Sequence, residues 1–182
     1  RYKEAGNIKN AVPFLHQDPD SDEILGQCEE SGRDQGHATL CVSLMGAFCQ
    51  MAYSIGEDLF AFDNYRAVAM AEYVGKYNLI KDEAFNKGTL VGDDFVYDSN
   101  SFPYTSYSNP SYTNTTISTD QRGTKRPAWE LFYGYCKAKG ISSIYSGKWA
   151  EQMRPDGGGG NYGPNSGGFD QLGFGTLMYY RE

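Results

Sequence analysis

Histidine and cysteine are scarce in this chain of 182 residues, which holds two and four of them. No Cys-x-x-Cys pair occurs, so we expect no zinc site, and we expect no cofactor. Asp18, Asp20 and Asp22 form a weak calcium-loop pattern, but Glu23 stands where such a loop needs Gly, so we favour a solvated acidic turn. Cys41 and Cys49 are separated by about 12 Å along one expected helix and cannot pair with each other. We expect buried free thiols, with a bridge between Cys28 and Cys136 as the alternative.

Membrane-spanning runs and positive charge are also lacking. The one uncharged stretch of sufficient length, residues 38–55, is interrupted by Thr39, Ser43, Gln50 and Ser54, so we expect a buried helix and no membrane partner. The formal net charge of −7 argues against nucleic acid as a partner. An anionic polysaccharide stays compatible with that charge if the few cations gather at one site. The 15 tyrosines favour carbohydrate binding, because flat rings stack on sugar faces.

One octapeptide gathers an acid, a cation, a carboxamide and a histidine at the start of the uncharged stretch: Glu30-Ser31-Gly32-Arg33-Asp34-Gln35-Gly36-His37. Burying polar groups at the start of a buried helix costs free energy of folding, so such a cluster indicates a functional role. His37 is therefore the leading candidate for an active-site residue. Near a helix N-terminus the imidazolium is disfavoured, which keeps His37 able to accept a proton. The structural alternative is a histidine hydrogen-bonded to Glu30 or Asp34.

This octapeptide resembles a signature of the alginate-lyase-type polysaccharide lyases, secreted bacterial enzymes with an α/α toroid fold. Residues 168–177 are similar to the close of the same domain. The resemblance implies β-elimination from a uronate polymer such as alginate or glucuronan, and a secreted or periplasmic location. The family also uses an Asn or similar donor from an earlier helix, which nothing before Glu30 supplies. We therefore expect residues 1–182 to be the C-terminal half of the domain, completed by the N-terminal half as a separate segment or chain.

A second group of residues is rich in cations. Arg122, Lys125 and Arg126 lie within five positions, ahead of an expected helix. Arg126 and Tyr133 are seven positions apart, which would place them on one face of that helix. The resemblance implies that Arg126 helps to bind the substrate carboxylate and that Tyr133 forms the acid/base pair with His37.

The expected site therefore has two sets of residues, with Tyr135 as the nearest competitor of Tyr133. The catalytic set is His37, Tyr133, Arg126 and Glu30. The substrate-binding set is Arg33, Gln35, Tyr104 and Arg122, in which Tyr104 belongs to an aromatic and polar loop expected over a cleft.

The expected fold is mainly α, an incomplete α/α toroid of inner and outer antiparallel helices with long loops. Hydrophobic patterning predicts helices over 34–55, 58–78 and 127–139. The first helix is apolar on every side and is expected to be buried all round, whereas the second is amphipathic and expected to lie outside it. Residues 1–30, with a solvated acidic turn at 18–22, and residues 79–121 show no helical period and are expected to form loops.

Two other functions are compatible with the sequence. A glycoside hydrolase on the same toroid would need two carboxylates across the scissile bond, and Glu30 with Asp34 or Glu130 would supply them. A glycan-binding module without catalysis would use the tyrosine-rich loop for stacking, and His37 would then be structural.

Overall fold

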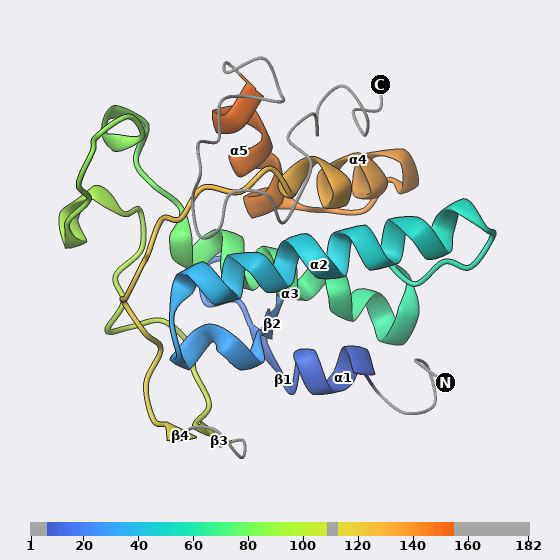
Figure 1. Cartoon of the computed structure of the whole chain (residues 1–182), viewed down its shortest axis with the longest axis horizontal. Helices are drawn as coiled ribbons and strands as arrows, with labels where there is room; N and C mark the ends of the chain where they lie inside the picture. The colour runs from blue at the N-terminus through green and yellow to red at the C-terminus, as the bar shows by residue number, and fades with distance from the viewer. Residues whose placement is uncertain (1–6, 109–112, 155–182) are drawn as a thin grey trace.

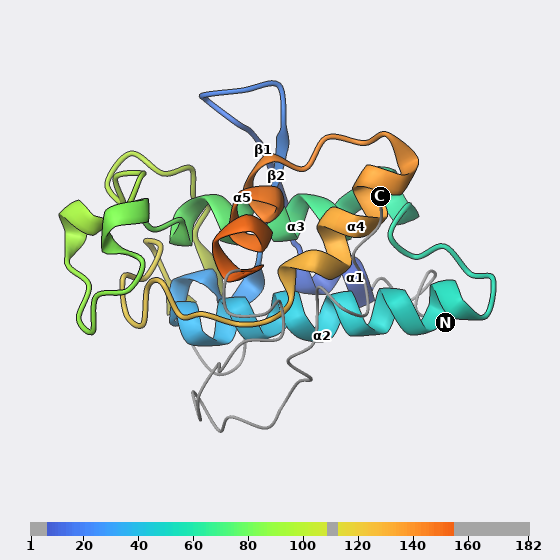
Figure 2. The ribbon, with the colours of Figure 1, turned by 90° about the horizontal axis from the view of Figure 1, so that it is seen from above.

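The computed structural model describes residues 7–108 and 113–154, which form a mainly helical structure (Figure 1). Two long helices, α2 (Gln35–Ser54) and α3 (Phe62–Asn78), run antiparallel along the long axis of the molecule. α4 (Trp129–Lys139) and α5 (Ile144–Met153) pack on one side of this pair, and α1 (Asn7–Ala11) contacts α3 from the other side (Figure 1). Seen from above, α4 and α5 lie over the pair (Figure 2). The segment 168–177 lies outside the described residues.

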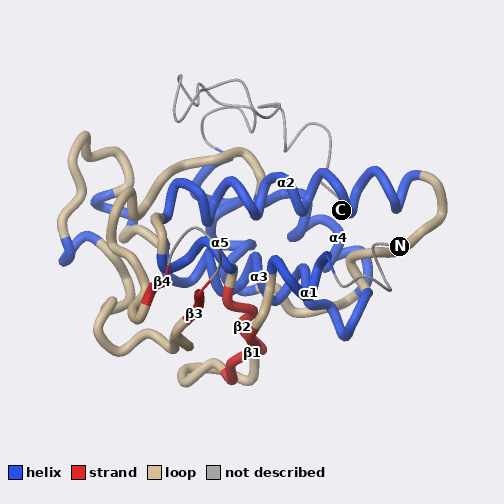
Figure 3. The backbone as a smooth tube through the Cα atoms, turned by 60° about the horizontal axis from the view of Figure 1, so that its bottom comes forward, coloured by secondary structure: helices blue, strands red, loops and turns tan. Residues whose placement is uncertain are grey.

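Two small antiparallel hairpins complete the described structure (Figure 3). β1 (Phe14–Gln17) pairs with β2 (Ile24–Gln27), with Phe14 opposite Gln27, and β2 packs on α3. β3 (Tyr107–Ser108) pairs with β4 (Thr113–Asn114) in the aromatic segment. The prediction of loop throughout residues 1–30 is therefore wrong, because this region contains α1 and the first hairpin.

α2 confirms the helix expected over 34–55. Asp34 adopts the extended conformation of an N-cap, and its side chain accepts a hydrogen bond from the backbone N–H of His37. At the other end the chain turns at Gly56, whose φ of 89° lies in the left-handed region that favours glycine. The sequence thus contains both signals that set the length of this helix.

α3 begins later than the expected residue 58. Asp63, Asn64 and Tyr65 have positive φ, so regular right-handed helix starts only at Arg66. The preceding Phe60 is fully buried and its ring stacks on Tyr135 of α4 at 4.4 Å. Phe60, which the periodicity placed in the first turn of the helix, therefore packs in the core ahead of the helix instead.

The burial of the two long helices is the reverse of the expected arrangement. α3 lies at the centre, and Glu72 and Lys76, which were expected on its exposed face, are both 1% exposed. Lys76 forms ion pairs with Asp18 and Asp20 of the first hairpin, so the acidic turn expected in solvent is in part an internal contact.

α2, in contrast, has an exposed apolar side in this chain. Leu44 is 55% exposed and Met51 is 64% exposed, while Leu40 and Phe48 are half-buried. The opposite side of α2 packs against α4. A Cβ added at Gly46 would lie only 2.9 Å from a ring carbon of Phe132. Among the described residues, none of the helices, α2 included, has the length and apolar character to cross a membrane.

α5 was not expected from the sequence, and its start is stabilised by a residue from another helix. Glu72 of α3 accepts hydrogen bonds from the backbone N–H groups of Tyr145 and Ser146, at 2.8 and 3.0 Å. The far end is held to α4 by two hydrogen bonds from Arg154 to Glu130. Because the capping carboxylate comes from a residue more than seventy positions away, local sequence carries no start signal for this helix.

Candidate functional site

His37 and Asp34 form a hydrogen-bonded pair at the N-terminus of α2. Asp34 accepts from the His37 backbone N–H with one oxygen, at 2.7 Å, and contacts His37 Nδ1 with the other, at 2.6 Å. The Asp34 side chain is 8% exposed, whereas the imidazole is 40% exposed. With Nδ1–H donated to the carboxylate, Nε2 is the ring nitrogen left to accept a proton. The structure thus orients His37 as a base whose reactive nitrogen faces away from its partner.

Arg33 and Glu30 lie beside this pair. Arg33 Nη1 is 3.4 Å from Glu30 Oε2, and Arg33 Nε is 3.7 Å from Asp34 Oδ2. The Arg33 side chain is 46% exposed, so its guanidinium remains accessible to a ligand. The octapeptide therefore presents one cation and one imidazole to solvent, both held by carboxylates.

Gln35, which was expected to bind substrate, is buried and serves a structural role. Its side-chain amide donates to the carbonyls of Ser31 and Ser118, at 2.9 and 3.0 Å, and its backbone N–H donates to Asp120. Its side-chain oxygen accepts from Asn78. These contacts use both amide hydrogens, so Gln35 holds residues 118–120 against the start of α2.

Asn78 fastens the other end of the same loop. Its side-chain oxygen accepts from the backbone N–H of Gly123 at 2.9 Å. Gly123 has a φ of 82°, and a Cβ there would be 2.7 Å from Leu90, so both conformation and space require glycine. Arg122 donates to the carbonyls of Tyr77 and Tyr97, both at 2.7 Å. Residues 118–125 are consequently a rigid loop, although they contain no helix or strand.

Gln121 is a candidate residue that the sequence did not reveal. Its φ of 54° is unusual for a residue with a side chain, and such backbone conformations concentrate at functional sites. Its side-chain oxygen lies close to Gly36, so a side chain at position 36 would displace the Gln121 carboxamide from its present place. Gln121 is itself exposed, and only the tertiary fold brings it to Gly36, the residue before His37.

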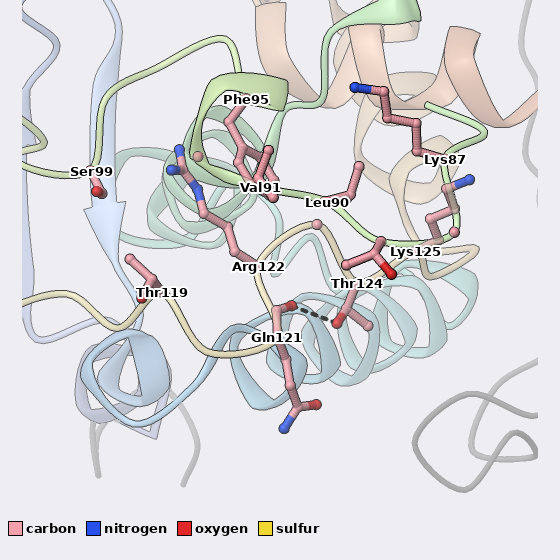
Figure 4. Close-up of a pocket in the computed structure, with 14 residues that line it drawn as sticks. Lys87, Leu90, Val91, Phe95, Ser99, Thr119, Gln121, Arg122, Thr124 and Lys125 are labelled. Carbon is pink, nitrogen blue, oxygen red and sulfur yellow. Dashed lines mark hydrogen bonds between the residues drawn. The ribbon is translucent and has the colours of Figure 1, made fainter. Parts of the chain in front are cut away.

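Gln121 also lines a cavity of about 800 Å³ between residues 87–95 and 119–125 (Figure 4). In Figure 4 the Gln121 carboxamide points away from Arg122 and toward α2, whereas the guanidinium of Arg122 extends toward Phe95. Lys87 and Lys125 lie together at the other end of the cavity. Arg122, expected to bind substrate, thus belongs to a cavity that Gln121 connects to the start of α2.

Tyr104, also expected to bind substrate, packs against the octapeptide. The side chain of Gln27 pairs with both backbone groups of Thr105, at 2.7 Å each, and so holds the loop in place. The Tyr104 hydroxyl and Asn114 enclose Gly32 so tightly that a side chain there would clash with both. The Tyr104 hydroxyl and the Asn114 amide nitrogen are buried with no hydrogen-bond partner. A smaller cavity of about 420 Å³, rich in threonine, opens at Tyr104.

Arg126 and Tyr133 are placed away from these residues. Arg126 precedes α4 and is 1% exposed, so the two residues do not share a face of one helix. The ring of Tyr133 packs on Gly147 of α5 and lies 5.4 Å from the Arg154 guanidinium. Tyr135, its competitor, is buried and donates to Asp58. The structure therefore gathers His37, Glu30, Arg33 and Tyr104 and leaves Tyr133 at the contact between α4 and α5.

No family model, curated protein or solved structure matches this chain. Within the described residues, no group of three or more His, Cys, Asp or Glu side chains is arranged to hold a metal ion. The four cysteines are free, and the Cys28 thiol is hydrogen-bonded to Cys41 rather than bridged to Cys136.

Proposed function

We propose that this chain belongs to a polysaccharide lyase that cleaves a uronate-containing polymer by β-elimination. The observation that carries the proposal is the Asp34–His37 pair, half-exposed at the start of α2 within an octapeptide that resembles the alginate-lyase signature. Elimination needs a base for the C5 proton, charge to stabilise the carboxylate-bearing carbanion, and an acid for the leaving oxygen.

His37 supplies the base in this proposal. Nε2 takes the C5 proton, and the Asp34 carboxylate stabilises the imidazolium that forms, because its oxygen is 2.6 Å from Nδ1. The exposed guanidinium of Arg33 faces the substrate carboxylate, while Glu30 limits the directions that Arg33 can take. Positive charge placed before the reaction stabilises the developing negative charge without reorganisation.

Two tyrosines are candidates for the acid. The resemblance implies Tyr133, whereas the position beside Gly32 favours Tyr104, whose buried hydroxyl has no partner of its own. Burial raises the pKa of Tyr104, which keeps this hydroxyl protonated at neutral pH. Tyr104→Phe and Tyr133→Phe decide between them: the variant of the true acid loses its turnover and keeps polymer affinity.

The proposal includes a secreted or periplasmic enzyme whose toroid is completed by an N-terminal half. The exposed apolar residues of α2, Leu44 and Met51, support a further segment packing there, since water-exposed apolar rows of this kind mark contact surfaces. The Asn or similar donor that the resemblance implies on an earlier helix would come from the same segment, as would helices that close the ring.

Hydrolysis has less support from the geometry. A glycosidase needs one carboxylic acid that stays protonated and a second carboxylate across the bond. Glu30 contacts Arg33, Asp34 contacts His37, and Glu130 is held by Arg154 through two hydrogen bonds. All three carboxylates therefore already have partners within the fold.

Products test the proposal directly. The protein, together with its N-terminal half, is incubated with alginate, glucuronan and neutral dextran, and the ultraviolet absorbance of unsaturated ends is followed. We expect unsaturated products from a uronate polymer alone, and a loss on the order of 10²-fold in His37→Ala. Saturated products would mean hydrolysis. Polymer binding without any product, unchanged in His37→Ala, would mean a glycan-binding module.

A further inference from the structure

We infer that the cavity between residues 87–95 and 119–125 is a subsite for the acidic sugar adjoining the one held at His37. This inference rests on the proposed function, and it adds the cavity, Gln121 and two lysines to the site. The cavity is large enough for a sugar ring, at about 800 Å³.

The charge of the cavity favours an anion. Its described lining includes Lys87, Arg122 and Lys125 and no carboxylate, in a chain whose net charge is −7. Arg122 hydrogen-bonds to two backbone carbonyls, which are neutral acceptors, and its charge also interacts with Asp98. Lys125 likewise donates to a neutral acceptor, the backbone carbonyl of Phe85. Asp94 pairs with Lys87 from outside the lining set, which moderates the positive charge at that end.

The polar lining suits a sugar in particular. Ser99, Thr119 and Thr124 add hydroxyl groups, and the Phe95 ring, which lies 4.2 Å from the Arg122 guanidinium, adds an apolar surface. Sugars combine hydroxyl groups with apolar ring faces, so a site with both kinds of surface and a fixed guanidinium matches a uronate.

Gln121 supplies the connection between the cavity and His37. It lines the cavity, and its carboxamide reaches Gly36, the residue before His37 (Figure 4). Gln35 and Asn78 hydrogen-bond to Ser118 and Gly123 on either side of Gln121, and these bonds hold Gln121 in its left-handed backbone conformation. We therefore place the neighbouring unit in the cavity, because Gln121 both lines it and approaches Gly36 at the start of α2.

The test measures binding separately from turnover. Every protein carries His37→Ala, so the polymer stays intact, and mobility is compared in gels containing alginate or neutral dextran. Lys87→Gln combined with Lys125→Gln removes two charges from the cavity. Lys81→Gln combined with Lys148→Gln removes two exposed charges outside it and is the matched control.

We expect the cavity pair to weaken alginate binding by roughly tenfold and the control pair by less than about twofold, with neither changing mobility in dextran. Gln121→Ala, which alters no charge, should weaken alginate binding as well. If the double variant does not fold, Lys87→Gln alone replaces it, because the half-exposed Lys87 side chain can be changed with little effect on folding. Equal losses in the two pairs, or no loss in either, would overturn the subsite.

Turnover of the protein with His37 intact separates this inference from the proposed function. Cavity-dependent binding without unsaturated products would reject the lyase reaction and keep an acidic-sugar site. Unsaturated products, together with alginate binding that the cavity variants do not change, would support the lyase reaction and reject the subsite.

Discussion

Asp34 has two roles at the scale of a single side chain, because one oxygen caps α2 and the other holds the His37 ring. Asp34→Asn keeps an acceptor for the cap and removes the charge that stabilises a protonated imidazole. We expect its elimination rate to fall on the order of 10²-fold while its melting temperature changes little.

Asp34→Ala removes the cap as well, at a cost of about 1 kcal/mol in the free energy of unfolding. Initial rates and thermal melts of the two variants, measured side by side, separate catalysis from stability. A wild-type rate in Asp34→Asn would show that His37 does not depend on this carboxylate.

Gly32 is a position where space, rather than chemistry, determines the residue. A Cβ there would overlap the Tyr104 hydroxyl and Asn114. We expect Gly32→Ala to lower the free energy of unfolding by about 1–3 kcal/mol, as overpacking does elsewhere. Gly88→Ala is the control, because a Cβ at Gly88 meets nothing within 4 Å. Urea denaturation of both variants gives the comparison, and equal midpoints would contradict this packing.

The sequence indicates candidate site residues only where they are close in the chain. The octapeptide ending at His37 could be found because its polar residues are contiguous and directly precede an uncharged helix. Gln121 could not be found, because it reaches Gly36 through a loop fastened by the buried carboxamides of Gln35 and Asn78. The internal contacts of Gln35 could not be predicted for the same reason: a carboxamide with internal partners cannot be distinguished by sequence from one that binds a ligand.

At the scale of helices, the contact between α3 and α5 should make stability depend on pH. Burial raises the pKa of Glu72 to about 7, and hydrogen bonds from Tyr145 and Ser146 offset only part of this shift. The folded protein then binds this proton more tightly than the unfolded chain, where the pKa is near its usual 4.5. The contribution of Glu72 is fully present below that value and is lost as the pH rises through about 7.

Glu72→Gln tests this dependence, because its side chain stays neutral while keeping an oxygen for α5. We expect the free energy of unfolding, measured in urea at a series of pH values, to become flatter between about pH 5 and 7. Exposed Glu83→Gln is the control and should keep the wild-type slope. A slope unchanged by Glu72→Gln would mean that this carboxylate does not titrate in the window.

The thiols give a second measurement at this scale. Burial raises the pKa of Cys49 and of Cys136 to about 12. The hydrogen bond to Cys41, followed by burial, raises the pKa of Cys28. Since thiolates react and thiols do not, we expect only the half-buried Cys41 to react quickly with a thiol reagent in the folded protein. All four should react in denaturant, and fast labelling of more than one thiol under native conditions would contradict this packing.

The elements that sequence patterning predicted are those whose signals are local. α2 has its cap at Asp34 and its stop at Gly56, and α4 lies within the expected helix over 127–139. α5 was not predicted because the side chain that caps its start, Glu72, comes from another helix. The same contact explains why α3 was placed on the outside: charged residues were taken as a solvent-facing side, whereas Glu72 and Lys76 have internal partners.

Across the whole molecule, the exposed side of α2 predicts an association. Leu44 and Met51 are already in water in this chain, so replacing both by Ser should change its free energy of unfolding by less than about 0.5 kcal/mol each. Binding to the proposed N-terminal half should instead weaken by tenfold or more, which titration calorimetry measures.

Leu15→Ser combined with Ile24→Ser provides the control, because these exposed apolar residues lie on the first hairpin. Loss of association in the control pair alone would place the contact on the hairpin and not on α2. The mainly α class was predictable from composition and periodicity, but which face stays uncovered depends on how four helices and a hairpin surround α3.

Residues 118–125 have no regular secondary structure, yet Gln35 and Asn78 hold them at both ends. Ordering a free loop when a ligand arrives costs about 1–2 kcal/mol of backbone entropy per residue. Here that entropy is lost when the protein folds, so the ligand meets a surface that is already ordered. The amide hydrogens of Ser118 and Gly123, which are bonded to Ser31 and Asn78, should accordingly exchange with deuterium as slowly as those inside α3.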